Sequence, residues 1–386
     1  MKKFMNEEVF LTTHTSKKLF HDYAAKAPIV EYNSSISAKD IFKRRTFDNL
    51  TKLWIENDPV KQQAMLQCGV DERFVTGVAS DYDKFLKFAE IMPKLIGSAV
   101  YHLAHMELQK CFGIHTPLDG KTAPEIWHKT GELLAKKKHD MVSMMDKLNV
   151  KVVCTMEDPA SDLEWHLRCA YSEHIPFAVL PTFVPDRFID IENTAWFSAI
   201  TELGARYGVV HDWESLKAAL GSALDAFCDA GCKLVLRETQ VEYNNDDPTE
   251  IIEKAIHQGA VSREEAEIYK GALNAFLSEE YEKRRLMVTD DPRWGGVIDV
   301  EYGVRSIANQ IDMLMETGKL SGSVSMLTGA CSVTSFVRHE YYRRILCEKI
   351  GLLVESGQYP SDLDFLGSMI QDICWRNAVS YFNFEI

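Results

Sequence analysis

The chain alternates between short apolar runs and longer amphipathic segments, and this alternation predicts its elements. Short runs rich in Val, Ile and Phe and bounded by Pro, Gly or polar clusters are typical of buried strands. Five runs fit this description well and two fit it weakly. The well-defined runs are residues 29–32, 150–155, 177–182, 231–236 and 324–327, and the weak ones are residues 286–288 and 297–300.

Helical spacing dominates the rest of the chain. Between about residues 40 and 148, apolar residues recur at helical intervals, as in Phe85, Phe88 and Ile91, and no convincing strand is present. Ser-x-x-Glu patterns beginning at Ser161 and Ser262 predict two helix starts. The other helices that we expect cover residues 195–207, a segment that ends at Gly318, and a tail that is helical to Phe382.

The repeated order of strand and helix predicts an α/β protein with a parallel sheet. A closed eight-stranded barrel needs one strand more than the seven runs provide, so we expect a distorted or incomplete (β/α)8 barrel. The predicted organisation is an N-terminal helix and first strand over residues 1–39, a helical insertion over residues 40–148, and the remainder of the barrel with C-terminal helices over residues 149–386.

The amino-acid composition excludes some classes of binding partner. The chain has 386 residues, 43 Lys and Arg and 57 Asp and Glu, which gives a net charge of −14, and it has no basic block that would neutralise the phosphates of a nucleic acid. Nucleic acid and anionic membranes are therefore not expected partners. Nine cysteines without paired short spacings are typical of a reducing compartment, and no secretion signal or membrane-length apolar run is present. We expect a cytoplasmic protein.

Several ordered strings resemble the uronate isomerase family of the amidohydrolase superfamily, whose members interconvert glucuronate or galacturonate with the keto-uronate. The matching strings are residues 47–51, 69–73, 101–108, 338–347 and 371–374. The resemblance extends over most of the chain and implies a distorted (β/α)8 barrel. It also implies a divalent metal such as zinc and aldose–ketose isomerisation of D-glucuronate or D-galacturonate in hexuronate catabolism.

This chain departs from the family pattern where the family holds its metal. The family's Asp-Tyr-His-Cys-His run reads Glu-Tyr-Asn-Ser-Ser here, so Asn33 and Ser35 replace the two histidines. Both replacements are neutral and bind zinc-like metals poorly. The family's Thr-Asp-Ser-Arg reads Thr-Gly-Ala-Cys, so Gly329 replaces the aspartate and Cys331 the arginine. We therefore expect no metal cofactor.

The substrate positions of the family are also replaced. Val60 stands where the family's Asp-His-Tyr-Lys-Trp segment has tyrosine, and Val184 stands where Trp-Arg-Pro-Asp has arginine. The family's next strand motif, with its His and Arg-Asn-Asn-Asn run, has no counterpart. Between residues 282 and 302 the chain omits about two βα units, on the order of 80 residues.

The resemblance and these replacements together predict a uronate isomerase-family protein that is catalytically impaired. Isomerisation by proton transfer needs a base, a group that stabilises the developing oxyanion, and a clamp for the carboxylate. Each was assigned by resemblance to a replaced position. The alternative is an active isomerase that uses substitute residues. The expected ligand is a uronate or related sugar acid, and a homo-oligomer is compatible with the sequence.

No residue stands out as a replacement catalyst. Glu157 and Asp158 follow the second strand and form the best surviving acidic pair, although the same residues also suit a turn before Pro159. Arg237 and Glu238 follow the fourth strand, where an ion pair between them is the favoured interpretation and anion binding the alternative.

Three other groups are better explained by structure than by chemistry. We expect His102 and His105 to pack and hydrogen-bond within a helix rather than to bind a metal. The Arg-His-Glu run at residues 338–340 suits pairing along a helix. The polar cluster at residues 290–294 before two glycines is most simply a turn that bridges the shortened barrel.

Overall fold

The computed structural model describes residues 3–236, 243–244, 246–288, 298–299, 303–324 and 326–386. All the paired strands in this part of the chain are parallel. The first sheet contains, in spatial order, β1 (Ile29–Ser34), β2 (Val150–Glu157), β3 (Ala178–Phe183), β4 (Leu234–Val235) and β5 (Met287–Val288), and a second pairs β6 (Ile298–Asp299) with β7 (Met326–Leu327).

The two sheets meet at one point. An isolated parallel bridge joins Ser34 at the end of β1 to Ala330, which follows β7. The strands therefore run in the order β6, β7, β1, β2, β3, β4, β5, and among the described residues no pairing joins β5 to β6. Each of the seven runs predicted from the sequence overlaps one of these strands, so the predicted incomplete α/β barrel is confirmed.

The C-terminal segment covers one face of the first sheet. Val30 and Tyr32 alternate along β1 and share a buried cluster with Phe382 and Phe384. The rings of Tyr32 and Phe382 are 5.1 Å apart. Phe382 ends α17 (Asn377–Phe382), so the predicted helical tail is confirmed.

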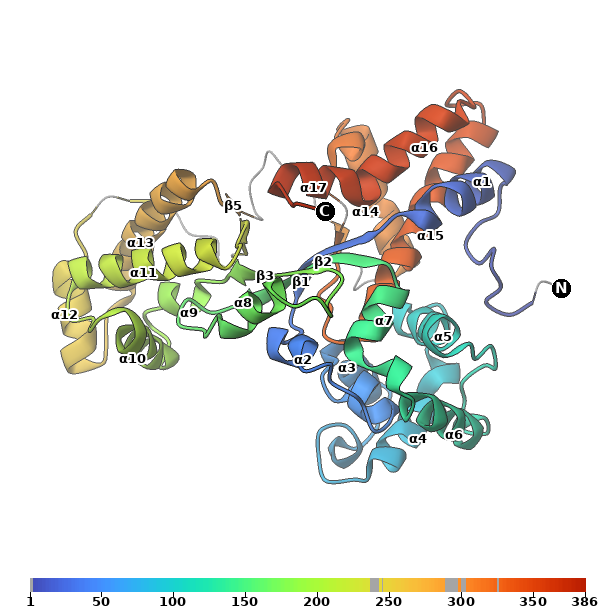
Figure 1. The fold of residues 1–386 in the computed structure, drawn as a ribbon, viewed down its shortest axis with the longest axis horizontal. Helices are drawn as coiled ribbons and strands as arrows, with labels where there is room; N and C mark the ends of the chain where they lie inside the picture. Colours follow the sequence, from blue (N-terminus) through green and yellow to red (C-terminus); the bar gives the residue numbers. More distant parts are fainter. Residues whose placement is uncertain (1–2, 237–242, 245, 289–297, 300–302, 325) are drawn as a thin grey trace.

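Every element that the structure describes between β1 and β2 is helical. Residues from these helices share the largest buried cluster with α1 (His14–Asp22) and α15 (Val337–Glu355). Figure 1 shows this group on one side of the first sheet. The longer helices of the group are α2 (Ala38–Phe42), α3 (Pro59–Gln67), α4 (Asp81–Ile91), α5 (Ala99–Phe112), α6 (Ala123–Leu134) and α7 (Met141–Lys147).

A second helical group lies beyond β3 and β4 (Figure 1). It has its own buried cluster, in which the indole N–H of Trp196 donates a hydrogen bond to the hydroxyl of Tyr269 at 3.1 Å. Its helices are α9 (Asp186–Ile189), α10 (Ala195–Tyr207), α11 (Trp213–Asp229), α12 (Thr249–Gln258) and α13 (Arg263–Arg284). The observed bounds of α10 match the predicted residues 195–207.

One predicted helix start is right and the other is wrong. Ser262 caps α13, because its hydroxyl accepts the backbone N–H of Glu265. In return, the side chain of Glu265 accepts the backbone N–H of Ser262. By contrast, α8 (Glu164–Ala170) begins after Leu163 without a side-chain cap. Ser161 is not the cap that the sequence suggested, because its hydroxyl hydrogen-bonds to Glu157 instead.

The remaining segments complete the chain. No described helix has the length and apolar character needed to cross a membrane.

All nine cysteines are free thiols. The other helices are α14 (Val304–Glu316) and α16 (Leu363–Gln371), and the short segments are η1 (Ala24–Lys26), η2 (Thr51–Ile55), η3 (Glu72–Phe74), η4 (Met92–Lys94), η5 (Lys137–His139), η6 (Leu320–Gly322), η7 (Val333–Phe336) and η8 (Asp372–Arg376).

Candidate functional site

The end of β1 and the segment after β7 lie side by side. The hydroxyl of Ser34 and the backbone N–H of Ser35 both donate to the backbone oxygen of Ala330, each at 3.0 Å. In a parallel barrel this carboxyl-terminal face carries the chemistry. The structure therefore brings Asn33 and Ser35 close to Gly329 and Cys331, as the resemblance implied for the positions of the family's metal and carboxylate ligands.

The side chains at this junction are poor metal ligands. Oδ1 of Asn33 is buried and has no hydrogen-bond partner in the described part of the chain, while Ser35 is exposed. Gly329 adopts a left-handed φ of +55° and offers no side chain. Cys331 is half-buried, and burial raises the pKa of its thiol above the ordinary value, which disfavours the thiolate that would bind a metal.

These observations decide whether a divalent metal fits. Neutral amide and hydroxyl oxygens are weak ligands for a zinc-like ion. Within the residues that the structure describes, no three His, Cys, Asp or Glu side chains are grouped closely enough to hold a metal. The residues present at this junction therefore do not fit the metal that the family resemblance implies.

The one carboxylate on β1 is committed to structural contacts. Oε2 of Glu31 lies 3.1 Å from Nε2 of His339, and the hydroxyl of Thr328 donates to the same carboxylate. The backbone N–H of Asn33 donates to Oε1 at 3.1 Å. Burial lowers the pKa of His339 below its ordinary value, although the contact with Glu31 opposes this effect. Glu31 joins β1 to α15.

Glu157 is a partly buried acid at a strand end. It ends β2, and its carboxylate accepts a hydrogen bond from the hydroxyl of Thr155 at 2.8 Å. The same hydroxyl lies 2.8 Å from Nε2 of His166, which is 3.5 Å from the carboxylate. Burial raises the pKa of Glu157, and burial lowers the pKa of His166 to about 4. Sequence reasoning missed His166, which sits within α8.

Asp158 forms an ion pair as well as a turn. One oxygen accepts the backbone N–H of Ala160 at 2.9 Å, and the other lies 3.2 Å from Nη1 of Arg187. Burial raises the pKa of Asp158, and Arg187 opposes this shift. Arg187 also contacts Glu202 at 3.1 Å. This arginine is three residues beyond Val184 and was not identified from the sequence. Arg237 and Glu238 lie outside the described residues.

A second buried polar group, unrecognised in the sequence, lies behind the junction. Asp58 caps α3 by accepting the backbone N–H groups of Val60 and Lys61, each at 3.1 Å. Its other oxygen is 2.8 Å from Nζ of Lys61, which is also 3.4 Å from Glu107. Arg338 of α15 lies 3.6 Å from Asp58. We call Asp58, Lys61, Glu107 and Arg338 the buried ionic cluster.

The side chains of the buried ionic cluster differ in how strongly their charged forms are favoured. Burial alone would raise the pKa of Asp58, but Lys61 and Arg338 hold it below its ordinary value. Burial would lower the pKa of Lys61, but Asp58 and Glu107 raise it above its usual range. Burial raises the pKa of Glu107 despite the neighbouring lysine. Asp58 and Lys61 are therefore the firmly charged pair.

The buried ionic cluster is closed to a sugar. It lines, together with Val60, a cavity of about 20 Å³. A cavity of this size holds about one water molecule. The cluster therefore joins α3, α5 and α15 behind the junction and does not itself provide a substrate pocket.

The two histidines of α5 have the packing role that the sequence favoured. Nδ1 of His102 lies 3.1 Å from the hydroxyl of Tyr341, and Nε2 of His105 accepts the backbone N–H of Leu118 at 2.9 Å. In α15, Arg344 pairs with Glu340 at 2.8 Å, so the expected pairing along this helix is also present.

Two parallel sheets that meet at one bridge, with helices around them and polar groups at their strand ends, define a protein of the α/β-barrel class. A family model described as glucuronate isomerase matches residues 1–289 and 297–382. The chain is 31% identical to a uronate isomerase of Endomicrobium trichonymphae over 468 aligned positions, which cover 100% of both chains. It is 32% identical to a uronate isomerase of Histophilus somni, with 99% of this chain and 100% of that protein covered. The chain belongs to the glucuronate isomerase family.

Solved structures show the same fold. The crystal structure of a uronate isomerase from Thermotoga maritima superimposes with a TM-score of 0.89 at 20% identity, covering 99% of this chain and 100% of that one. A glucuronate isomerase from Caulobacter crescentus gives 0.88 at 15% identity, covering 99% and 97%.

The chain is shorter than the relatives that it matches. An alignment of 468 positions over a chain of 386 residues leaves 468 − 386 = 82 positions without a residue here. The family match breaks at residues 290–296. This break lies inside the stretch, residues 282–302, where the sequence suggested an omission of about this size.

Proposed function

We propose that the protein binds a uronate or related sugar acid at the carboxyl ends of β1, β2, β3 and β7, and that it isomerises this ligand slowly or not at all. The observation that carries the proposal is the junction of Asn33, Ser35 and Gly329. The end of β1 and the segment after β7 meet there, and they offer two neutral side chains and a glycine. The relatives, named uronate isomerase, supply the class of ligand.

The chemistry explains why these replacements matter. Isomerisation removes a proton from the carbon next to a carbonyl, holds the resulting enediolate, and returns the proton to the neighbouring carbon. A positioned base contributes about 10²–10⁴ in rate and one oxyanion donor about 10²–10³. Loss of several such groups together leaves little turnover.

Arginine at the strand ends supports retained binding. Arg187 follows β3 and is partly exposed, with a side-chain exposure of 40%. Its guanidinium already pairs with Asp158 and Glu202, so a sugar carboxylate would have to compete with these two acids. Binding through Arg187 is therefore expected to be weak.

An active isomerase with substitute residues is the second candidate, and one constellation favours it. Glu157 has a raised pKa, as a general base near neutral pH requires, and Thr155 and His166 hold its carboxylate at the end of β2. The names of the relatives support this second candidate better than the first, because both relatives are described as uronate isomerases over their full length.

Binding and turnover must be measured separately to choose between the candidates. Isothermal titration of the purified chain with D-glucuronate and D-galacturonate measures binding, and an assay for the keto-uronate measures turnover. We expect saturable binding that Arg187→Met weakens, without ketose formation above a heated control. Ketose formation that Glu157→Gln abolishes would establish the second candidate. Glu164→Gln is the matched control, because Glu164 is exposed on α8 and pairs with Arg168. No binding of either uronate would refute the first.

A further inference from the structure

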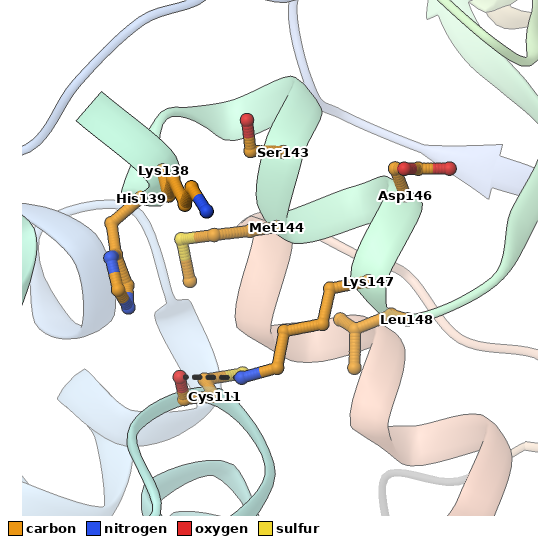
Figure 2. Close-up of a pocket in the computed structure, with 8 residues that line it drawn as sticks. All are labelled: Cys111, Lys138, His139, Ser143, Met144, Asp146, Lys147 and Leu148. Atoms are coloured by element: carbon orange, nitrogen blue, oxygen red, sulfur yellow. Dashed lines mark hydrogen bonds between the residues drawn. The ribbon is translucent and has the colours of Figure 1, made fainter. Parts of the chain in front are cut away.

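A cavity of about 470 Å³ lies next to the segment that leads into β2, and Figure 2 shows the residues that line it. Its walls come from the end of α5, from η5 and from α7. The last residues of α7 lead directly into Val150, the first residue of β2. The cavity therefore lies near the amino-terminal end of β2, whereas the proposed sugar-acid site lies at the carboxyl ends of the strands.

Three basic side chains line this cavity. Lys138 and His139 belong to η5, and Lys147 belongs to α7. Nζ of Lys147 lies 3.4 Å from the backbone oxygen of Cys111, as Figure 2 shows. Neither lysine forms an ion pair with a carboxylate in the part of the chain that the structure describes. Both amines are therefore without a carboxylate partner there, although the protein has a net charge of −14.

The other polar groups of the wall do not neutralise this charge. Asp146 points away from the two amines in Figure 2. The hydroxyl of Ser143 is already bonded, because it donates to Asp140 at 2.7 Å and accepts from Arg44 at 2.9 Å. Among the described residues, no carboxylate of this wall forms an ion pair with Lys138 or Lys147.

His139 provides a second, independent observation. Its Nδ1 atom is buried and has no hydrogen-bond partner among the described residues. Burial lowers the pKa of His139, and Lys147 and Lys136 lower it further, so the ring stands in a positive field. A buried ring nitrogen without a partner is costly, and a ligand oxygen in the cavity would satisfy it.

We infer that this cavity binds the phosphate group of a small metabolite, held by Lys138, His139 and Lys147. A volume of about 470 Å³ lies within the range of about 300–1,000 Å³ that is usual for small-molecule sites. Three donors suit a phosphate dianion better than a single carboxylate. Met144 and Leu148 provide an apolar wall for the remainder of the molecule. Three basic groups are too few for a nucleic acid, which requires a longer positive surface.

A purely structural role for Lys147 makes a different prediction. Its amine lies beside the backbone oxygen of Cys111, in the last turn of α5, where a cation stabilises a helix. Replacing a lysine of that kind would lower stability and leave anion binding unchanged. The two roles are therefore separable by measurement.

Isothermal titration with inorganic phosphate, at constant ionic strength set with sodium chloride, tests the inference. We expect one saturable site per chain, with an affinity that falls at least tenfold in Lys147→Met and in His139→Gln. Lys94→Met is the matched control, because Lys94 is an exposed lysine in η4 that does not line the cavity, and the phosphate affinity of this variant should not change.

Four results would overturn the inference. The first is a lack of saturable binding at phosphate concentrations up to about 10 mM, which excludes affinities tighter than millimolar. The second is equal weakening by Lys94→Met, which means non-specific screening. The third is Lys147→Met and His139→Gln proteins that unfold more readily but bind phosphate unchanged. The fourth is acetate that binds as tightly as phosphate, since acetate carries a carboxylate.

Discussion

Oε2 of Glu31 lies 3.1 Å from Nε2 of His339, and each side chain is 1% exposed. Glu31 comes from β1 and His339 from α15, which follows β7. This contact joins the first strand to the helix that follows the last strand, beside Asn33, where the family resemblance would put a metal ligand. The carboxylate nearest the strand-end junction thus has structural partners on each oxygen.

The buried ionic cluster gives the first prediction. Lys61→Met leaves Asp58 and Glu107 buried without their lysine, so the free energy of unfolding should fall by about 3–5 kcal/mol. Urea unfolding followed by circular dichroism measures this loss. Lys52→Met is the control, because Lys52 forms an exposed pair with Glu56 and should change stability by less than about 1 kcal/mol. Equal losses of stability in the two variants would show that burial of the cluster does not raise the cost of removing its lysine.

His166 gives a prediction about pH. Its pKa in the folded chain is about 4, below the ordinary value of about 6.5, so the neutral ring is favoured by folding. Its contribution is present above pH 6.5 and is lost as the pH falls toward 4, by up to about 3 kcal/mol. Glu157 acts in the opposite direction, because its raised pKa adds stability as the pH falls.

A comparison of wild type with His166→Gln isolates the histidine, since Glu157 is present in both. Unfolding in urea at several pH values should show wild type losing stability more steeply than the variant between pH 6.5 and 4. Parallel pH profiles for the two proteins would mean that His166 keeps an ordinary pKa in the folded chain.

The C-terminal helix gives a prediction about stability. Phe382 is 1% exposed and packs on Tyr32 of β1. Phe382→Ala should lower the free energy of unfolding by about 3–5 kcal/mol, because it leaves a cavity against the sheet. Phe365→Ala is the control, since Phe365 is 53% exposed and should have little effect. A small effect of Phe382→Ala would mean that the tail does not support the incomplete barrel.

Much of the fold could be predicted because its signals are local. Each strand coincides with a run of apolar residues, and Ser262 and Glu265 form the cap that their spacing predicts. Ser161 shows the limit of this reasoning. Its spacing to Glu164 satisfies the same pattern, but Glu157 at the end of β2 takes its hydroxyl instead. Ser161 thus bonds to a residue that precedes it in the chain, and the helix that follows begins without its cap.

The candidate site was less predictable because its partners are distant in the chain. Lys61 and Glu107 are 46 residues apart, so no local spacing indicates that they meet. Glu31 and His339 are 308 residues apart. Only the closing of β1 against the segment after β7 brings such groups together. The replaced positions could be identified because they occupy a contiguous family motif at each strand end.

Restoring the family residues tests whether the scaffold or only its ligands have changed. We expect the combined variant Asn33→His, Ser35→His, Gly329→Asp and Cys331→Arg to bind a divalent metal at most, without isomerising a uronate. An arginine at position 331 would enter a region where Lys61 and Arg338 already act on the Cys331 thiol. Elemental analysis after dialysis measures the metal, and ketose formation measures turnover. Turnover by this variant would show that the shortened barrel still positions a substrate.

We propose that the junction of Asn33, Ser35 and Gly329 no longer supports proton transfer on a uronate. Exchange of the C2 proton of D-glucuronate and D-galacturonate in heavy water, followed by NMR, tests this most directly because it detects enediolate formation even when no product accumulates. We expect exchange no faster than with heat-inactivated protein. Catalytic exchange that heating abolishes, and that Glu157→Gln removes, would contradict it.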